Sequence, residues 1–356
     1  MDVGHCYLDG NPDAVEFCPH DSFKNVLAVS TYTLQEGDQP SRLGSLSLFN
    51  VDACAGLLEL SHRVETAGIF DIKWAPVGQV SDEYLPLLAQ ADANGYLRVH
   101  KLESSSYGSS ATSEASLREL ADEQVSSTSM CLCLDWNPSS NSISVGLSDG
   151  SLSIVSFTES MLEIQEMWKA HDFEVWAASF DIHQPQLVYT GSDDCKFSCW
   201  DLRAGPSQPA FQNSKIHKMG VCCITKNNPS DPNTLLTGSY DEHLRIWDVR
   251  SISKPVNETS VCLGGGVWRL KHNPLEPSYV LAACMHNGFG LVRIDNGGEK
   301  IDVVETYGKH ESLAYGADWQ RGELIVDGKR KNNAVATCSF YDRLLRVWIP
   351  ECQMFL

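Results

Sequence analysis

Runs in which apolar and polar residues alternate recur along the chain, and three of them share one pattern. In each, an Asp is followed six residues later by a Trp, and alternation along a strand puts two such side chains on the same face. The pattern predicts a β-strand near the end of a repeated unit. The three runs with their pairs are CKFSCWDLR at 195–203 (Asp194, Trp200), EHLRIWDVR at 242–250 (Asp241, Trp247) and RLLRVWIPE at 343–351 (Asp342, Trp348).

Four weaker copies of this strand begin at a glycine, namely at Gly44, Gly95, Gly150 and Gly288. Together with the strong copies they mark seven units whose turns lie 45 to 55 residues apart. A four-stranded blade takes about 40 to 45 residues, so each interval holds one blade and some loop residues. Inner-strand runs such as CLCLDWNP at 131–138 lie between the copies, and helical periodicity is nearly absent. The sequence therefore predicts an all-β fold, a seven-bladed β-propeller.

The two ends of the chain are expected to meet in the last blade. After Trp348, only Ile349 and the segment 350–356 remain, which is too short for a complete outer strand. Residues 5–9 precede the first inner strand and can supply the missing one, which closes the ring and removes exposed sheet edges. We expect one domain over residues 1–356, with polar loop insertions near 103–129, which is rich in serine, and near 320–333.

The chain is strongly acidic. It carries 27 basic and 46 acidic residues, so its formal net charge is −19, which opposes binding to nucleic acid and favours a cationic partner. No apolar run approaches the roughly 18 to 20 residues of a membrane span, and the N-terminus lacks the pattern of a secretory signal. The 13 Cys residues have no framework spacing, as in proteins of a reducing compartment. We expect a monomer in the cytoplasm or nucleus that binds neither nucleic acid nor membranes.

Three histidines complete the repeat pattern. His171, His217 and His310 precede the Trp of their units by 29, 30 and 38 residues. This spacing resembles that of the WD-repeat family, in which such a His bridges the Asp and the Trp of its own blade. We therefore interpret the three histidines as structural. The glycine that the family places before the His is replaced by Ala170, Ile216 and Lys309.

The C-terminal half, from about Lys169 to Trp348, carries a narrower resemblance. The motifs MGVCCI, GSYDEHLRIWDVR, GGGVWRLKHNP, LAACMHNGF, YGADW and ATCSFYD follow one another there. In this order they resemble the eukaryotic diphthine methyl ester hydrolases. The resemblance implies a carboxylic ester hydrolase of diphthamide biosynthesis, which removes a methyl ester from a modified histidine of elongation factor 2. It also implies a substrate side chain with a trimethylammonium group, and no cofactor.

Two motifs that suggest other chemistry fit the blade pattern better. The segment 146–150 matches the GxSxG of a nucleophile elbow, but that elbow joins a strand to a helix. Here it joins two strands of the third unit, so we interpret Ser148 as a turn residue. Two cysteine pairs lie within strands and have no second pair to complete four ligands, so no metal site is expected. These pairs are Cys131 with Cys133, and Cys195 with Cys199.

His286 is the candidate general base. It occupies a turn position that is Asp in the preceding unit, but its own unit has Val292 at the Trp position and glycines at 264–266 near the His position. Its usual structural partners are therefore missing, which favours a catalytic role. Glu242 and His243 on the neighbouring turn are further catalytic candidates. The backbone amides of 264–266, or His243, are expected to stabilise an oxyanion.

The connections between blades and the turns within them emerge at one end of a propeller, so their aromatic residues are expected on a common rim. Aromatic faces bind a quaternary ammonium cation with about 0.5 to 2 kcal/mol each. Gly265 is expected to leave room for the modified side chain. The aromatic candidates for substrate binding are Trp176, Tyr240, Trp268, Tyr315 and Tyr341.

A non-catalytic propeller that docks a protein partner is the alternative function, because most WD-repeat propellers act in this way. A nuclear adaptor that binds histones is a third hypothesis that agrees with the acidic charge. Release of methanol from methyl-ester-modified elongation factor 2 distinguishes an enzyme from both.

Overall fold

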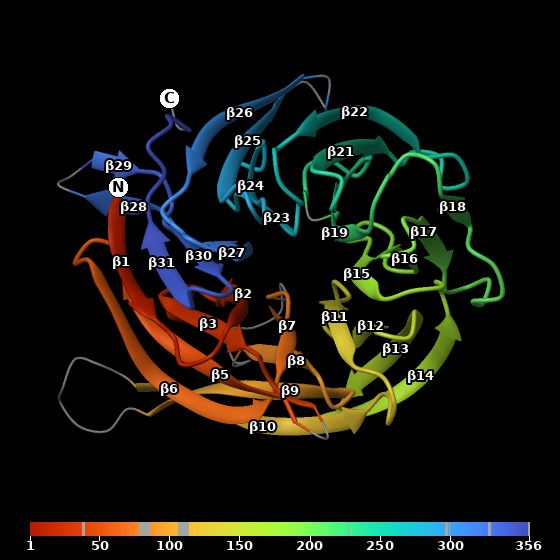
Figure 1. Cartoon of the computed structure of the whole chain (residues 1–356), viewed down its shortest axis with the longest axis horizontal. Helices are drawn as coiled ribbons and strands as arrows, with labels where there is room; N and C mark the ends of the chain where they lie inside the picture. The colour runs from red at the N-terminus through yellow and green to blue at the C-terminus, as the bar shows by residue number, and fades with distance from the viewer. Residues whose placement is uncertain are drawn as a thin grey trace.

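The computed structural model describes the chain except for residues 38–39, 78–85, 106–113, 227, 296–297, 299, 327–328 and 355–356. Seven antiparallel sheets surround a central axis, and the innermost strand of each lies toward that axis (Figure 1). The predicted seven-bladed propeller is therefore confirmed. The helix that the described residues form is the short 3-10 turn η1 (Asp21–Phe23). Within this part of the chain, no helix has the length and apolar character needed to cross a membrane.

The first four blades follow the chain order from the axis outward. Blade 1 contains β2 (Pro12–Phe17), β3 (Val26–Thr31), β5 (Ser41–Asp52) and β6 (Leu57–Ala67), with β4 (Thr33–Gln35) also paired to β5. Blade 2 contains β7 (Ile69–Trp74), β8 (Leu87–Asp92), β9 (Tyr96–Ser105) and β10 (Glu114–Gln124). Blade 3 contains β11 (Cys131–Trp136), β12 (Ser142–Leu147), β13 (Ser151–Thr158) and β14 (Met161–Lys169). Blade 4 contains β15 (Val175–Phe180), β16 (Leu187–Ser192), β17 (Phe197–Asp201) and β18 (Phe211–Asn213).

The last three blades complete the ring. Blade 5 contains β19 (Val221–Thr225), β20 (Thr234–Ser239), β21 (His243–Asp248) and β22 (Val256–Cys262). Blade 6 contains β23 (Arg269–His272), β24 (Tyr279–Ala283), β25 (Phe289–Asp295) and β26 (Lys300–Tyr307). Blade 7 contains β27 (Ala314–Trp319), β30 (Val335–Ser339), β31 (Leu344–Trp348) and β1 (Asp2–Tyr7), and a hairpin of β28 (Leu324–Val326) and β29 (Lys329–Lys331) precedes β30.

The ring closes through the N-terminal strand, as the sequence predicts. β1 is the outermost strand of blade 7 and pairs antiparallel with β31, with Tyr7 opposite Leu344. The strand begins earlier than the predicted segment 5–9, because the pairing extends almost to the first residue. There the Met1 amino group donates to the Ile349 carbonyl oxygen at 2.7 Å.

The two segments predicted as loop insertions contain strands, which corrects that expectation. The segment 103–129 holds the end of β9 and all of β10. Ala115 and Leu117 of β10 are buried in the core that blades 1 and 2 share, and this alternation is typical of a strand with one buried face. The segment 320–333 holds the hairpin of β28 and β29. Residues 106–113 and 327–328 of these segments lie outside the described residues.

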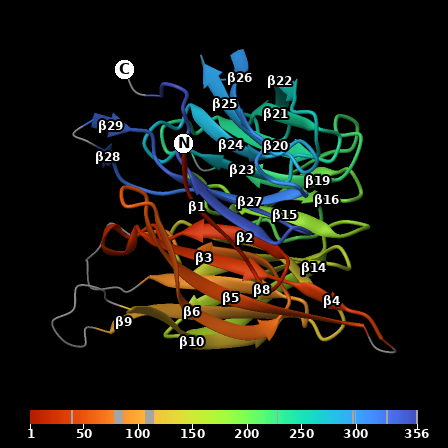
Figure 2. The same ribbon diagram turned by 60° about the vertical axis from the view of Figure 1, so that its left-hand side comes forward.

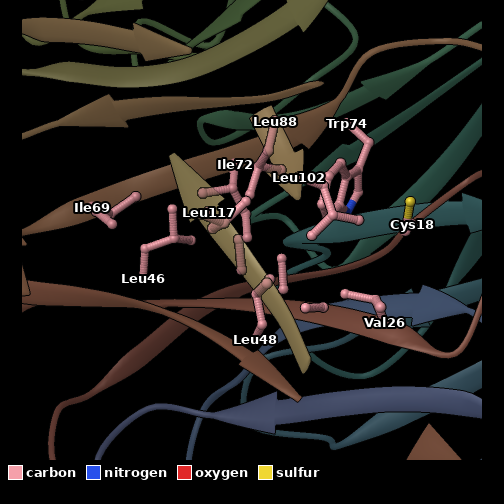
Figure 3. Packing of buried hydrophobic residues seen from close by; sticks show 13 residues of the cluster. Cys18, Val26, Leu46, Leu48, Ile69, Ile72, Trp74, Leu88, Leu102 and Leu117 are labelled. Carbon is pink, nitrogen blue, oxygen red and sulfur yellow. The ribbon is translucent and has the colours of Figure 1, made fainter. Parts of the chain in front are cut away.

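Each blade buries its faces against its neighbours. Figure 3 shows the interface of blades 1 and 2, where Leu46 and Leu48 of β5 pack in one cluster with Ile72 of β7. Trp74 at the end of β7 donates its Nε1 hydrogen to the Glu16 carbonyl oxygen of β2 at 3.0 Å, which ties the two innermost strands together. Equivalent hydrogen bonds join two other pairs of blades. Trp136 Nε1 of blade 3 donates to the Lys73 carbonyl oxygen of blade 2, and Trp319 Nε1 of blade 7 donates to the Lys271 carbonyl oxygen of blade 6.

The predicted histidine networks form, but a threonine joins their members. In blade 4, His171 contacts Asp194 through Nδ1 at 3.1 Å and Thr190 Oγ1 through Nε2 at 2.8 Å. Trp200 Nε1 donates to the same threonine oxygen at 2.9 Å. The expected direct bridge from His to Trp is therefore corrected to a bridge through Thr190, which joins two strands of the blade, β16 and β17, to the connection before it.

Blades 5 and 7 carry variants of this network. In blade 5, Thr237 Oγ1 lies 2.9 Å from both His217 Nε2 and Trp247 Nε1, whereas Asp241 binds Arg245 at 2.7 Å in place of the histidine. In blade 7, a serine stands between the histidine and the aspartate. The residues of that network are His310, Thr337, Ser339, Asp342 and Trp348.

Thr190→Val removes the shared oxygen while it keeps the side-chain shape. Two buried nitrogen atoms, on His171 and Trp200, then lose a partner at about 1 to 3 kcal/mol each, so we expect the free energy of unfolding to fall by roughly 2 to 4 kcal/mol. Urea unfolding followed by tryptophan fluorescence measures this change. The matched control is Thr158→Val at the exposed end of β13, for which we expect less than about 0.5 kcal/mol. Equal effects of the two substitutions would contradict the assigned role of Thr190.

Candidate active site on the propeller axis

Aromatic rings line one end of the propeller axis, and we call this group the aromatic cup. The centroids of contacting rings lie 4.7 to 5.8 Å apart, so each ring touches at least one other. Met285 and Leu313 pack in the same cluster. The cup consists of Tyr32, Phe70, Trp176, Tyr240, Trp268, Tyr315 and Phe340.

These rings come from two kinds of segment that reach the same face. One kind is the start of an innermost strand, and the other is the turn that follows the second strand of a blade. Antiparallel pairing puts both at one end of the axis. The strand-start group is Phe70, Trp176, Trp268 and Tyr315, and the turn group is Tyr32, Tyr240 and Phe340.

The innermost strands are irregular where the cup begins. β2, β7, β11, β15, β19 and β27 each have a shift of pairing register within their first residues. Such a bulge adds a residue on one strand and redirects the neighbouring side chain. In β7 it lets two consecutive residues reach the axis, because Phe70 joins the cup while Asp71 pairs across the axis.

Charged side chains meet on the axis below the cup. Arg269 of β23 and Asp71 of β7 form an ion pair at 2.9 Å, although blades 7 and 1 separate their strands. This pair therefore crosses the centre of the ring. Buried charges are tolerated where each has a partner. Two residues further along the same strands lie the pairs Lys271 with Glu16, and Lys73 with Asp135.

Asp13 of β2 is a buried carboxyl without such a partner. It is 2% exposed, and its Oδ1 has no hydrogen-bond partner in the described part of the chain. Burial raises the pKa of Asp13 to about 7, while the charge of Arg269 opposes the rise and that of Asp71 adds to it. Trp268 lies beside this carboxyl and favours its ionised form, yet the indole Nε1 completes no hydrogen bond with any described residue.

A cavity of about 520 Å³ opens beside the cup. Its wall is mostly apolar, with Arg42 and Glu174 as the charged side chains, and its size is typical of a small-ligand site. The hairpin of β4 and β5, which projects from blade 1 in Figure 2, forms one side. The lining residues are Asn11, Tyr32, Thr33, Leu34, Arg42, Phe70, Met130, Leu132, Glu174, Trp176, Phe340 and Tyr341.

The structure brings most of the predicted substrate-binding residues together. Trp176, Tyr240, Trp268 and Tyr315 are members of the cup. Tyr341 contacts Phe340 at 5.0 Å but is 70% exposed, so it lies at the edge of the cavity.

Gly265 has a different role from the predicted one. A Cβ atom at this position would lie 2.1 Å from the Cys284 carbonyl oxygen, so the turn of its own blade occupies the space. Gly265 therefore permits close backbone packing and leaves no room there for a substrate side chain, which corrects the prediction.

The three residues predicted as catalytic lie outside the cup. His286 is exposed between β24 and β25, and no described residue forms a hydrogen bond with its ring. Glu242 is exposed before β21, and His243 is half-buried with its Nδ1 2.6 Å from the Asp241 carbonyl oxygen. No described contact joins His286 to the other two, so their catalytic roles stay predictions.

Tyr32, Phe70, Phe340 and Asp13 complete the site but are absent from the sequence-based prediction. A signal for Asp13 exists, because PDAVEF at 12–17 places two acidic residues in a strand that should be apolar. An acid in such a strand indicates a paired or functional group. Tyr32 and Phe70 lie in the N-terminal half, where the family resemblance adds little.

The motifs set aside in the sequence lie where the blade pattern puts them. Ser148 is in the turn between β12 and β13, and its Oγ accepts the Met130 N–H at 2.9 Å. Cys131, Cys133 and Cys199 are buried, and Cys195 is half-buried. Over the residues that the structure describes, no group of three or more His, Cys, Asp or Glu side chains is arranged to hold a metal ion.

The carboxyl of Asp13 makes stability depend on pH in a defined direction. It loses its proton near its ordinary pKa of 3.8 in the unfolded chain but only near 7 in the folded chain. Stability therefore falls as the pH rises from about 4 to 7, because the folded state alone still holds this proton. Asp13→Asn abolishes the effect, so the variant should gain roughly 2 to 4 kcal/mol relative to the parent between about pH 4 and pH 8. Urea unfolding at both pH values measures this, and a constant difference would show that Asp13 titrates normally.

Comparisons with known proteins agree with this architecture. Residues 163–201 and 212–248 match the family model described as WD domain, G-beta repeat. A chain in the crystal structure of the mitotic checkpoint complex superimposes with a TM-score of 0.69 over 98% of this chain and 95% of that one. At 16% identity this likeness shows the fold alone.

Two relatives match over most of their length. The Dictyostelium discoideum protein named diphthine methyltransferase homolog is 31% identical over 97% of this chain and 98% of its own. The diphthine methyltransferase of Mus musculus is 37% identical over 86% of this chain and 67% of its own. The chain therefore belongs to the diphthine methyltransferase family of WD-repeat proteins.

Proposed function

We propose that this protein hydrolyses the methyl ester of methylated diphthine on elongation factor 2, a step in diphthamide biosynthesis. Relatives that cover most of the chain are named diphthine methyltransferase, which supports an enzymatic role in this pathway. The choice of ester hydrolysis rests on the resemblance of the C-terminal motifs.

The aromatic cup is the observation that carries the proposal. The trimethylammonium group of the substrate has no N–H to donate, so aromatic faces bind it best. Trp268 and Tyr315 stack at 4.8 Å with an interplanar angle of 24°, and Trp176 and Tyr240 contact Trp268 at 5.4 and 5.8 Å. Each ring that faces the cation contributes about 0.5 to 2 kcal/mol, so several rings supply a substantial affinity for one side chain.

Acidic groups beside the cup add attraction for a cation. Glu174 lines the cavity. Burial raises the pKa of Asp193, and the negative charge of Glu174 is the second largest cause of the rise. The contribution of Glu174 indicates a negative electrostatic potential beside the cavity. The net charge of −19 acts in the same direction at longer range.

Hydrolysis and methyl transfer change the same group in opposite directions. A methyltransferase adds the methyl group to a substrate atom, whereas the proposed reaction returns a carboxylate and methanol. The products therefore distinguish the two.

With methyl-ester-modified elongation factor 2 and no methyl donor, we expect one methanol released per ester, and mass spectrometry should show the loss of one ester methyl group. Binding of the modified protein without methanol release would support a docking propeller instead. Methylation of diphthine from S-adenosylmethionine would support the reaction that the relatives' name states. Either result would contradict the proposal.

Trp176→Leu and Tyr315→Leu should raise KM by about tenfold or more and leave kcat at saturation within about threefold, because these rings bind the cation equally in the ground and transition states. The matched control is Trp168→Leu on β14, a half-buried Trp that contacts Trp200 outside the cup, and its KM should not change. Tetramethylammonium chloride should compete with the substrate, and sodium chloride at the same concentration should not. The same KM for the parent and both cup variants would contradict the assignment of the cup.

A further inference from the structure

Three buried polar atoms at the aromatic cup have no hydrogen-bond partner among the described residues, namely Oδ1 of the adjacent Asp13 and the Nε1 atoms of Trp176 and Trp268. Asp13 Oδ1 and Trp268 Nε1 are both buried without a partner in this part of the chain, and the two side chains lie beside each other. A buried polar atom costs about 1 to 3 kcal/mol when it is unpaired, so the pair calls for an explanation other than stability.

The charge of Asp13 acts on three tyrosines of the cup. Burial raises the pKa of both Tyr32 and Tyr315, and the negative charge of Asp13 is the second largest cause of the rise. Burial also raises the pKa of Tyr240, with a smaller contribution from the same carboxyl. Tyrosines from blades 1, 5 and 7 are therefore near enough to one buried carboxyl for its charge to raise their pKa.

The groups below the cup leave Asp13 able to accept a proton. Arg269 is the nearest cation, but its Nη1 already binds Asp71 at 2.9 Å. Burial therefore prevails over Arg269 and raises the pKa of Asp13 to about 7, and a carboxylate with such a pKa is an effective general base near neutral pH. The titratable and charged groups that interact electrostatically with Asp13 are Tyr32, Asp71, Tyr240, Arg269, Tyr315 and Cys338.

We propose that Asp13 is the general base that activates water against a methyl ester whose cationic end lies in the aromatic cup. This inference rests on the proposed ester hydrolysis. Trp268 Nε1–H donates to the oxygen of the attacking water, and the water donates one proton to Asp13 Oδ1. This leaves a lone pair of the water oxygen for the carbonyl carbon of the ester.

The reaction balances without a further reagent. A bond forms between the water oxygen and the carbonyl carbon while the proton passes to Asp13. The tetrahedral intermediate then breaks its bond to the methoxy oxygen, which takes the proton from Asp13 and leaves as methanol. The new carboxylic acid gives its proton to solvent, and Asp13 is again ionised.

The test compares Asp13→Asn with a matched variant on the same strand, with modified elongation factor 2 as substrate. Asp13→Asn should lower kcat by about 10² to 10⁴, with KM within about threefold. The control is Glu16→Gln, because Glu16 is also buried on β2 and burial also raises its pKa to about 7, but it pairs with Lys271 below the cup. Its kcat should stay within about threefold of the parent.

Two further readouts separate a catalytic role from a structural one. Added formate should restore part of the turnover of Asp13→Ala, because a small carboxylate can replace the missing base. The kcat of the parent should rise with pH through one ionisation near 7, and the residual activity of Asp13→Asn should lack this rise. The pH dependence of kcat is measured on the parent protein, so it does not depend on whether a variant folds. A kcat of the parent that stays constant between about pH 5.5 and 8 would overturn the inference.

The outcomes distinguish this inference from the proposed function. If the parent releases no methanol, both fail. If the parent is active and a folded Asp13→Asn variant keeps its kcat within about threefold, the inference alone is overturned and ester hydrolysis stands. A large loss of turnover in His286→Ala together with an active Asp13→Asn variant would place the base on the exposed turn instead.

Discussion

Closure of the ring is the constraint on which the rest of the structure depends. A blade is a small sheet with apolar faces and exposed edges, and it becomes stable only between two neighbours. Blade 7 is complete because β1, from the other end of the chain, pairs with β31. The contacts across the axis join strands of blades that are not neighbours, such as Arg269 with Asp71 and Trp176 with Trp268, so they exist only in the closed ring.

The closed ring brings polar groups from distant blades into one poorly solvated space, where unpaired charge is costly. The paired charges and the aromatic cup, which lie at different depths along the axis, therefore have different roles. The lower charges are paired and stabilise the interior, whereas the aromatic cup covers a carboxyl that has no partner of its own. Because Asp71 binds Arg269, Asp13 keeps a raised pKa instead of forming an ion pair. The packing that stabilises the ring thus also sets the chemistry of the site.

The histidine networks position the rim. Blades 4, 5 and 7 carry a threonine that joins a His and a Trp, and these blades also supply Trp176, Tyr240 and Tyr315. Such a network fixes the connection before the innermost strand, where the cup residues begin. Blade 6 has Val292 at the Trp position, and its glycine-rich connection instead packs closely on its own turn at Cys284.

The sequence by itself determined the number of blades, the closing strand and much of the rim, because each of these follows from a local pattern of residues. Alternation, the Asp-to-Trp spacing and the repeat intervals each depend on residues of a single blade, so Trp176, Trp268 and Tyr315 could be placed on one face. The strand β10 was missed because its serine-rich surroundings hide the alternation of Ala115 and Leu117.

Only the tertiary structure decided which groups meet on the axis. The surroundings of Asp13 come from Asp71, Trp268 and Arg269, which belong to other blades. The burial of Gly265 under Cys284 and the exposure of His286 also depend on how turns pack after the blades assemble. Desolvation and charge act through space, and a pattern read along one strand contains no information on the distance between strands that face each other across the ring.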